Sequence, residues 1–125
     1  MPIDHSQPYD DTNIFARILR GELPAETLLE TEHSLAFHDI HPLAPIHALV
    51  IPRGAYVSWD DFSAKASEAE IVDFVRAVGE VARIVGADTQ GYRLLANSGK
   101  RAGQEVAHLH VHVFGGAPLG PMLAR

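Results

Sequence analysis

The pattern of apolar and polar positions along the chain predicts one long helix over residues 67–85. In this stretch apolar residues recur three or four positions apart and so share one helix face; they are Ile71, Phe74, Val75, Val78, Ala82 and Val85. Ser67 and Glu70 have the spacing of a capping box at the helix start. Gly86 is a natural end for the helix.

A second, shorter helical pattern covers residues 11–20. Its apolar positions form one stripe, made of Ile14, Phe15, Ile18 and Leu19. Either Asp11 or Thr12 can cap the first turn, because short polar side chains accept hydrogen bonds from free N–H groups there. Gly21 then stops the helix.

Five short stretches have the length and composition of β-strands. They cover residues 26–30, 34–39, 47–51, 92–97 and 108–114. The first two are close enough to form a hairpin. Two prolines make the segment after the second strand a loop, since proline cannot join regular strand pairing. The order of one helix, three strands, one helix and two strands predicts an α+β fold with a mostly antiparallel sheet.

Three histidines alternate with apolar residues in the last of these strands, between His108 and His112. In a strand, side chains at alternate positions point to the same face. The run therefore places three imidazoles on one side of the sheet and three aliphatic side chains on the other, namely Leu109, Val111 and Val113. We expect the chemistry on the histidine face.

The composition is that of an ordinary globular domain. The 125 residues are 46% hydrophobic and 21% charged, which suits a single domain over residues 12–125 behind a flexible arm over residues 1–11. No apolar run approaches the length of a membrane span, and the polar N-terminus resembles no secretory or transit signal, so we expect a cytoplasmic protein. The net charge of −6 argues against a general nucleic-acid surface. The absence of cysteine excludes disulfides, thiol catalysis and thiolate zinc sites.

Imidazole can serve as a nucleophile, an acid or a base near neutral pH. His110, the middle residue, could attack a phosphorus atom through one nitrogen while a backbone carbonyl holds the other. The loop over residues 98–104 leads into the same strand, and its glycines allow N–H groups to converge on an anion. The pattern thus favours phosphoryl chemistry at His110.

Two other interpretations of the three histidines stay open at this point. Alternating histidines on a strand are also a pattern of zinc or copper ligands. The rings could instead be satisfied by backbone partners on a half-buried face, although burying three polar rings without a purpose costs stability.

Sequence blocks spread over residues 12–123 resemble the histidine triad nucleotide-binding proteins, the Hint branch of the histidine triad (HIT) family. The stretch from His108 to Phe114 fits the triad signature, His-φ-His-φ-His-φ-φ with φ apolar. The similarity continues through residues 13–15, 20–25, 35–42, 44–52 and 103–106, and the tail over residues 115–122 is similar to that of bacterial members.

The resemblance implies a fold and an activity. The fold would be a five-stranded antiparallel sheet with one long and one short helix, continued across a homodimer. The substrate would be a purine nucleotide whose α-phosphate carries an amine or acyl group, as for a purine nucleoside phosphoramidase, and the product a nucleoside monophosphate. His110 would form a nucleotidyl-histidine intermediate that water resolves. The resemblance implies neither a metal nor a cofactor.

The resemblance also implies roles for other residues. His112 would contact the phosphate oxygens, while His108 and His47 would form a hydrogen-bond relay that orients the triad. Asp39 would bind the ribose hydroxyls. The base would lie among Ile14, Phe15, Phe37 and Ile40, and the phosphate among Asn97, Gly103, Glu105 and Val106.

Glu105 departs from members of the family that carry a serine there. An ionised carboxylate only accepts hydrogen bonds, so the leaving-group preference stays open. Asn13 and Ala16 stand where some relatives carry zinc-binding cysteines, and no zinc is expected there. A non-catalytic nucleotide-binding or partner-binding dimer, and a divalent-metal protein, remain as alternatives to the enzyme.

Overall fold

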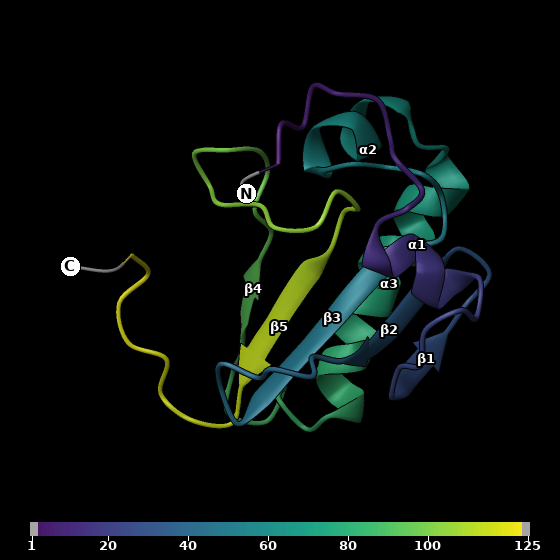
Figure 1. Ribbon diagram of the computed structural model, residues 1–125. Helices are drawn as coiled ribbons and strands as arrows, with labels where there is room; N and C mark the ends of the chain where they lie inside the picture. Colours follow the sequence, from purple (N-terminus) through teal and green to yellow (C-terminus); the bar gives the residue numbers. More distant parts are fainter. Residues whose placement is uncertain (1–2, 124–125) are drawn as a thin grey trace.

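A five-stranded antiparallel sheet organises residues 3–123, the part of the chain that the computed structural model describes (Figure 1). In chain order the strands are β1 (Thr27–Glu30), β2 (Ser34–His38), β3 (Ile46–Pro52), β4 (Arg93–Leu95) and β5 (Val111–Gly115). Their order across the sheet is β1-β2-β3-β5-β4, and every neighbouring pair is antiparallel. The predicted α+β class and antiparallel sheet are confirmed.

Three helices accompany the sheet, α1 (Ile14–Leu19), α2 (Trp59–Lys65) and α3 (Glu68–Ile84). The long helix is confirmed, and it begins with the predicted capping box between Ser67 and Glu70. Helix α2, which is seven residues long, was not predicted from the sequence. A second capping box, between Ser58 and Asp61, starts α2 and was the signal that could have found it.

The predicted caps of α1 were wrong. Asn13 is the N-cap, and its side-chain oxygen accepts the N–H of Ala16 at 2.9 Å. Thr12 is instead engaged in a turn with Asp10, whose carboxylate accepts both the N–H and the hydroxyl of Thr12. The helix therefore starts later than predicted.

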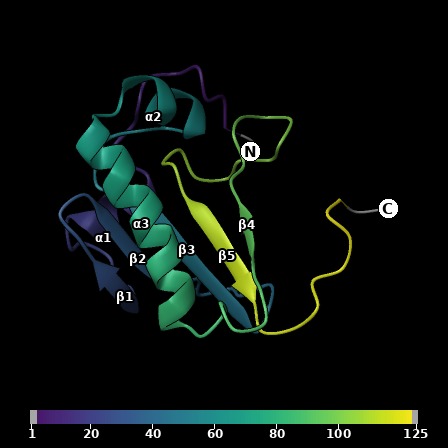
Figure 2. The ribbon, with the colours of Figure 1, turned by 180° about the vertical axis from the view of Figure 1, so that it is seen from behind.

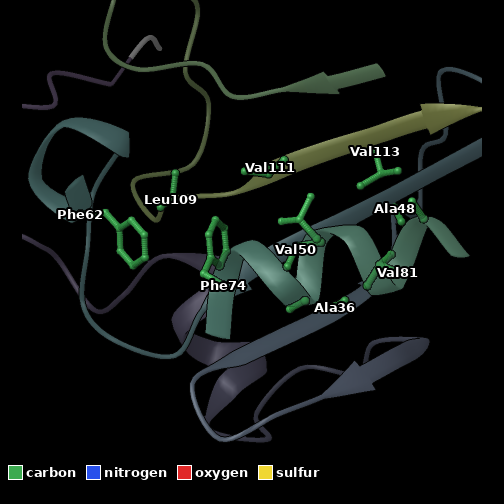
Figure 3. Close-up of a cluster of buried hydrophobic side chains, with 12 residues drawn as sticks. Ala36, Ala48, Val50, Phe62, Phe74, Val81, Leu109, Val111 and Val113 are labelled. Atoms are coloured by element: carbon green, nitrogen blue, oxygen red, sulfur yellow. The ribbon is translucent and has the colours of Figure 1, made fainter. Parts of the chain in front are cut away.

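The sheet separates two apolar clusters. On one face α3 packs against alternate residues of β2, β3 and β5 (Figures 2 and 3), among them Ala36, Val50, Val111 and Val113. On the other face α1 covers a smaller cluster of Phe15, Leu35, Phe37, Leu49 and Ile51. Because neighbours along a strand point to opposite faces, the residues between Val111 and Val113 belong to the second side.

The histidine strand is shorter than predicted, since β5 begins at Val111. Its pairing with β3 starts where Val50 faces Val111, and β3 ends two residues later at Pro52, which has no N–H to give. The predicted alternation nonetheless continues before the strand. Leu109 is in the α3 cluster, whereas His110 packs against Phe15 on the opposite side.

The segment before α1 is tied to the domain at the residues described. The N–H of Ile3 donates to the carbonyl of Gln104 at 2.9 Å, and the Tyr9 hydroxyl lies 2.6 Å from a ring nitrogen of His108. The flexible arm expected for residues 1–11 stays a prediction. The outer ends of the predicted arm and domain, residues 1–2 and 124–125, lie outside the described residues.

Within residues 3–123, no helix combines the length and the apolar character needed to cross a bilayer.

Candidate active site

Four histidines gather on the face of the sheet that α3 does not cover. The β3–β5 register places His47 opposite Phe114 and Leu49 opposite His112, so His47 and His112 are diagonal neighbours on one face. Their ring centroids are 5.1 Å apart, and that of His110 lies 5.0 Å from that of His112. The structure thus brings together the histidines that the sequence analysis selected.

His110 has one nitrogen held and one free. Its Nδ1 lies 2.8 Å from the carbonyl oxygen of His108, and a carbonyl can only accept, so Nδ1 carries the proton. Burial lowers the pKa of His110, with the His108 carbonyl opposing the shift, and the ring is neutral at pH 7. Nε2 therefore carries a free lone pair, the form that a nucleophile requires.

Hydrogen bonds fix which ring nitrogen carries the proton in His47 and in His112. The N–H of Leu43 donates to Nδ1 of His47 at 3.1 Å, so the His47 proton is on Nε2. That N–H donates to Nδ1 of His112 at 2.9 Å, which leaves the His112 proton on Nε2. Burial, followed by the neighbouring rings of His110 and His47, lowers the pKa of His112 to about 4. His112 therefore presents an N–H donor at neutral pH.

His108 stands apart from the relay with His47 that was expected. Its Nε2 donates to the carbonyl of Pro52 at 2.7 Å, and its Nδ1 lies 2.6 Å from the Tyr9 hydroxyl. The ring is fully buried, and burial lowers its pKa to about 4. The His47 partner is His112, because the β3–β5 register places these two residues beside each other.

Asp39 lies at the open end of the histidine group. One carboxylate oxygen accepts the N–H of His41 at 2.8 Å, and the other is 3.4 Å from Nε2 of His47. Asp39, His47 and His112 each offer a ligand atom, all within 4.8 Å of one another, which is a donor set that divalent metals accept. Since Nδ1 of His47 is occupied by Leu43, a metal would have to use Nε2 and replace the hydrogen bond to His112.

The residues expected around the base divide into two groups. Phe15 and Phe37 are buried with ring centroids 5.7 Å apart, and the Phe15 ring lies 5.0 Å from that of His110. Val106 packs against the same cluster. Ile14 and Ile40 are 48% and 79% exposed, so their apolar surface is open to a ligand.

Several backbone N–H groups of the loop before the histidines form hydrogen bonds within that loop. Gly99 donates to the Gln104 side chain at 2.9 Å, Gly103 to the Lys100 carbonyl at 3.1 Å, and Gln104 to the Gly99 carbonyl at 3.1 Å. The N–H of Gly103, expected to face a phosphate, is therefore engaged inside the loop. By contrast, the N–H groups of Glu105 and Val106 donate to no acceptor within residues 3–123. The Asn97 side chain, half-buried, makes no hydrogen bond there either.

Two residues outside the predicted set support the site. Gln104 is 1% exposed, and its amide donates to the carbonyls of Val57 at 2.6 Å and Val106 at 3.0 Å. It therefore fixes the loop next to the histidines. Tyr9 contacts His108 from 99 positions away, and no local sequence signal indicates such a long-range contact.

Comparisons with known proteins agree with this geometry. A family model described as the HIT domain matches residues 20–119. An uncharacterised 13.2 kDa HIT-like protein of Azospirillum brasilense is 63% identical over 120 residues, covering 96% of this chain and 98% of that protein. The purine nucleoside phosphoramidase of Escherichia coli K12 is 39% identical over 115 residues, covering 92% and 96%. A solved HIT family hydrolase from Clostridium thermocellum superposes with a TM-score of 0.80 at 35% identity, covering 92% and 99%.

Proposed function

The chain belongs to the histidine triad (HIT) family, and on that basis we propose that it hydrolyses purine nucleoside 5′-phosphoramidates, or acyl and aminoacyl nucleotides, to the nucleoside monophosphate. The observation that carries the proposal is the state of His110. Its Nδ1 proton is held by the His108 carbonyl at 2.8 Å, so Nε2 is an uncharged nucleophile in a buried site.

The first half of the reaction transfers the nucleotidyl group to the protein. Nε2 of His110 bonds to the α-phosphorus, and the P–N bond breaks with its electron pair on the departing nitrogen. That nitrogen takes up a proton as it leaves. That proton comes from solvent water, and we assign the Nε2–H of His112, which His47 maintains, as a hydrogen-bond donor to a phosphate oxygen.

The second half restores the enzyme. The oxygen of a water molecule bonds to phosphorus, the Nε2–P bond of His110 breaks with its electron pair returning to Nε2, and the proton of the water is released to solvent. One water is consumed, and the nucleoside monophosphate is released. The nucleophile and the hydrogen-bond donor are both imidazole side chains, so these steps assign no role to a metal.

The same proposal gives the remaining residues roles in binding. The free N–H groups of Glu105 and Val106 are donors for phosphate oxygens. One carboxylate oxygen of Asp39 lies 3.4 Å from Nε2 of His47. The carboxylate therefore has lone pairs left to accept hydrogen bonds from the ribose hydroxyls. Ile14 and Ile40 would cover the base from outside the buried pair of phenylalanines. The name of the Escherichia coli relative supports the choice of a purine.

We also infer a homodimer joined along β4. This strand is at the edge of the sheet, and an unpaired edge is a template for a second strand. Beside it lies an apolar groove of about 620 Å³, whose lining includes Trp59 of α2, Val75 of α3, Leu94 of β4, and Tyr92 just before β4. Exposed apolar surface of this kind is typical of an interface. A second copy pairing through β4 would extend the sheet and cover the groove.

Steady-state hydrolysis of adenosine 5′-phosphoramidate tests the enzyme. Wild type is compared with His110→Ala and His110→Gly, with and without EDTA, and the exposed His38→Ala serves as the control for loss of an imidazole. We expect turnover in wild type and His38→Ala, none in the His110 variants, and no effect of EDTA. A wild type that binds the nucleotide without turnover would favour the binding-module alternative, and loss of turnover in EDTA would favour the metal alternative.

A further inference from the structure

The N-terminal arm, residues 3–10, runs alongside the loop that precedes the histidines and continues to α1 (Figure 1). Ile3 donates its N–H to the Gln104 carbonyl at 2.9 Å. The His5 ring lies so close over Gly99 that a Cβ at that position would collide with it. The arm thus contacts the loop at two points before it reaches Tyr9.

Tyr9 meets His108 with both its ring and its hydroxyl. The two rings pack edge to face with centroids 5.5 Å apart, and the hydroxyl oxygen is 2.6 Å from Nδ1 of His108. Because Nε2 of His108 donates to the Pro52 carbonyl at 2.7 Å, Nδ1 of this neutral ring must accept. The Tyr9 hydroxyl therefore donates, and burial raises the pKa of that hydroxyl, so its proton is retained at neutral pH.

His108 connects this contact to the nucleophile. The His108 ring is fixed at both nitrogens, one by Tyr9 and one by Pro52. The carbonyl of the same residue accepts the Nδ1 proton of His110 at 2.8 Å. A backbone rotation at residue 108 would move that carbonyl away from His110 and would release the tautomer that leaves Nε2 free.

We propose that Tyr9 is a positioning residue for the nucleophile: its hydroxyl holds His108 so that the His108 carbonyl keeps the proton of His110 on Nδ1. Without the hydroxyl, Nδ1 of His108 becomes a buried acceptor with no partner, and the ring loses one of its two anchors. The kinetic part of this inference rests on the function proposed above. The structural part, the link from Tyr9 to the His110 ring, stands without it.

A matched pair of substitutions tests the proposal. Tyr9→Phe removes the hydroxyl and keeps the ring that packs on His108. Tyr56→Phe removes another half-buried hydroxyl, which donates to Glu70 at 2.9 Å and has no hydrogen bond to the four histidines within residues 3–123. Both variants lose one hydrogen bond, so a general effect on stability would appear in both.

We expect Tyr9→Phe to lower kcat for adenosine 5′-phosphoramidate about tenfold and to leave KM within about twofold of wild type, because misplacement of a reacting group acts on the chemical step. Tyr56→Phe should leave kcat at the wild-type value. Equal kcat losses in the two variants, or a Tyr9→Phe enzyme with the wild-type kcat, would overturn the proposal.

Nitrogen-15 NMR of the histidine rings gives a readout that does not depend on turnover. In wild type, Nδ1 of His108 should be an unprotonated, hydrogen-bonded nitrogen and Nδ1 of His110 a protonated one. In Tyr9→Phe the ring signals of both residues should shift, whereas in Tyr56→Phe they should not. The opposite tautomer in wild type, or unchanged His110 signals in Tyr9→Phe, would overturn the proposal even if the wild type hydrolyses the substrate. If the wild type has no turnover, the proposed function fails, and these spectra alone decide on Tyr9.

Discussion

Nε2 of His47 lies 2.9 Å from Nδ1 of His112, although the two residues are 65 positions apart in the chain. The contact exists because β3 and β5 are adjacent and antiparallel, with Leu49 opposite His112. Together with the N–H of Leu43 on Nδ1 of His47, it fixes the tautomers of both rings. The donor that the reaction needs on His112 is therefore established by the loop before β3.

The first prediction concerns this pair. His47→Ala should lower kcat about 100-fold, because His112 loses the group that holds its proton on Nε2. His47→Gln should lose less, since an amide N–H can still donate to Nδ1 of His112. Steady-state kinetics on adenosine 5′-phosphoramidate measure both. Equal activity of the Ala and Gln variants would mean that the hydrogen bond to His112 has no role.

Acid should destabilise the fold in a window set by the buried histidines. The pKa of His108 is about 4 in the folded state and 6.5 as its ordinary value, so between these values the unfolded chain binds more protons than the folded one. Stability is then full above pH 6.5 and is lost as the pH falls toward 4. His108, which is fully buried, accounts for a slope of about 1.4 kcal/mol per pH unit.

Urea unfolding at a series of pH values from 7 down to roughly 4.5, above the range where most carboxylates titrate, measures this slope. His108→Gln removes one of the buried titrating rings and should lower the slope by about 1.4 kcal/mol per pH unit. If this variant has the same slope as wild type, the acid sensitivity comes from other groups.

Asp39→Asn should weaken the use of ribonucleotides. If the carboxylate accepts from the ribose hydroxyls, the amide loses part of that acceptor strength, and kcat/KM should fall about tenfold for adenosine 5′-phosphoramidate. The loss should be smaller for the 2′-deoxy substrate, which lacks one of the hydroxyls. Equal losses on the two substrates would instead indicate that Asp39 acts through its contact with His47, whose Nε2 is 3.4 Å away.

Glu105→Ser should change the leaving-group preference. Glu105 is exposed, and a serine hydroxyl there could donate a proton where an ionised carboxylate only accepts. We expect about a tenfold gain in kcat for phosphoramidates of basic alkylamines and little change for acyl nucleotides, whose leaving groups need no proton. Glu105→Ala is the control for loss of charge, and an equal gain in that variant would contradict the explanation.

Leu94→Glu should separate the proposed dimer. Leu94 is 49% exposed on the edge strand and lines the groove, whereas Ile84 is 48% exposed on α3 and does not line it, so Ile84→Glu is a matched control. Two like charges facing each other across the joined edges should weaken association about 100-fold. Sedimentation at micromolar concentration measures the mass. A 13.6 kDa wild-type species would contradict the dimer.

The sequence predicted well those features that depend on local periodicity or on a spaced motif. The apolar face of α3 and its capping box are readable from Ser67 onward, and the alternation at residues 108–112 predicts which side chains share a face. The same reasoning failed at α2, because the capping box between Ser58 and Asp61 was not recognised. It also placed the N-cap of α1 at Asp11 or Thr12 instead of Asn13, because all three are plausible caps.

Within the site, residue types could be predicted but partners could not. His47 was selected as part of a relay with His108, but its hydrogen bond goes to His112, because the partner depends on the register between β3 and β5. Tyr9 and Gln104 were not selected at all. Their roles come from contacts across the fold, such as Gln104 to Val57, and a single sequence contains no local pattern for such contacts.

The alternation in β5 has a consequence for how this chain tolerates insertions and deletions. Val111 and Val113 fill the cluster under α3, and His110 and His112 face the opposite side of the same sheet. Loss of one residue within this run would turn every side chain beyond it to the other face. Imidazole side chains would then pack against α3, and valine side chains would line the reaction site. A one-residue register shift in this strand would therefore disrupt the apolar core and displace the nucleophile at the same time. Such a shift cannot produce a form of the protein that is stable but inactive.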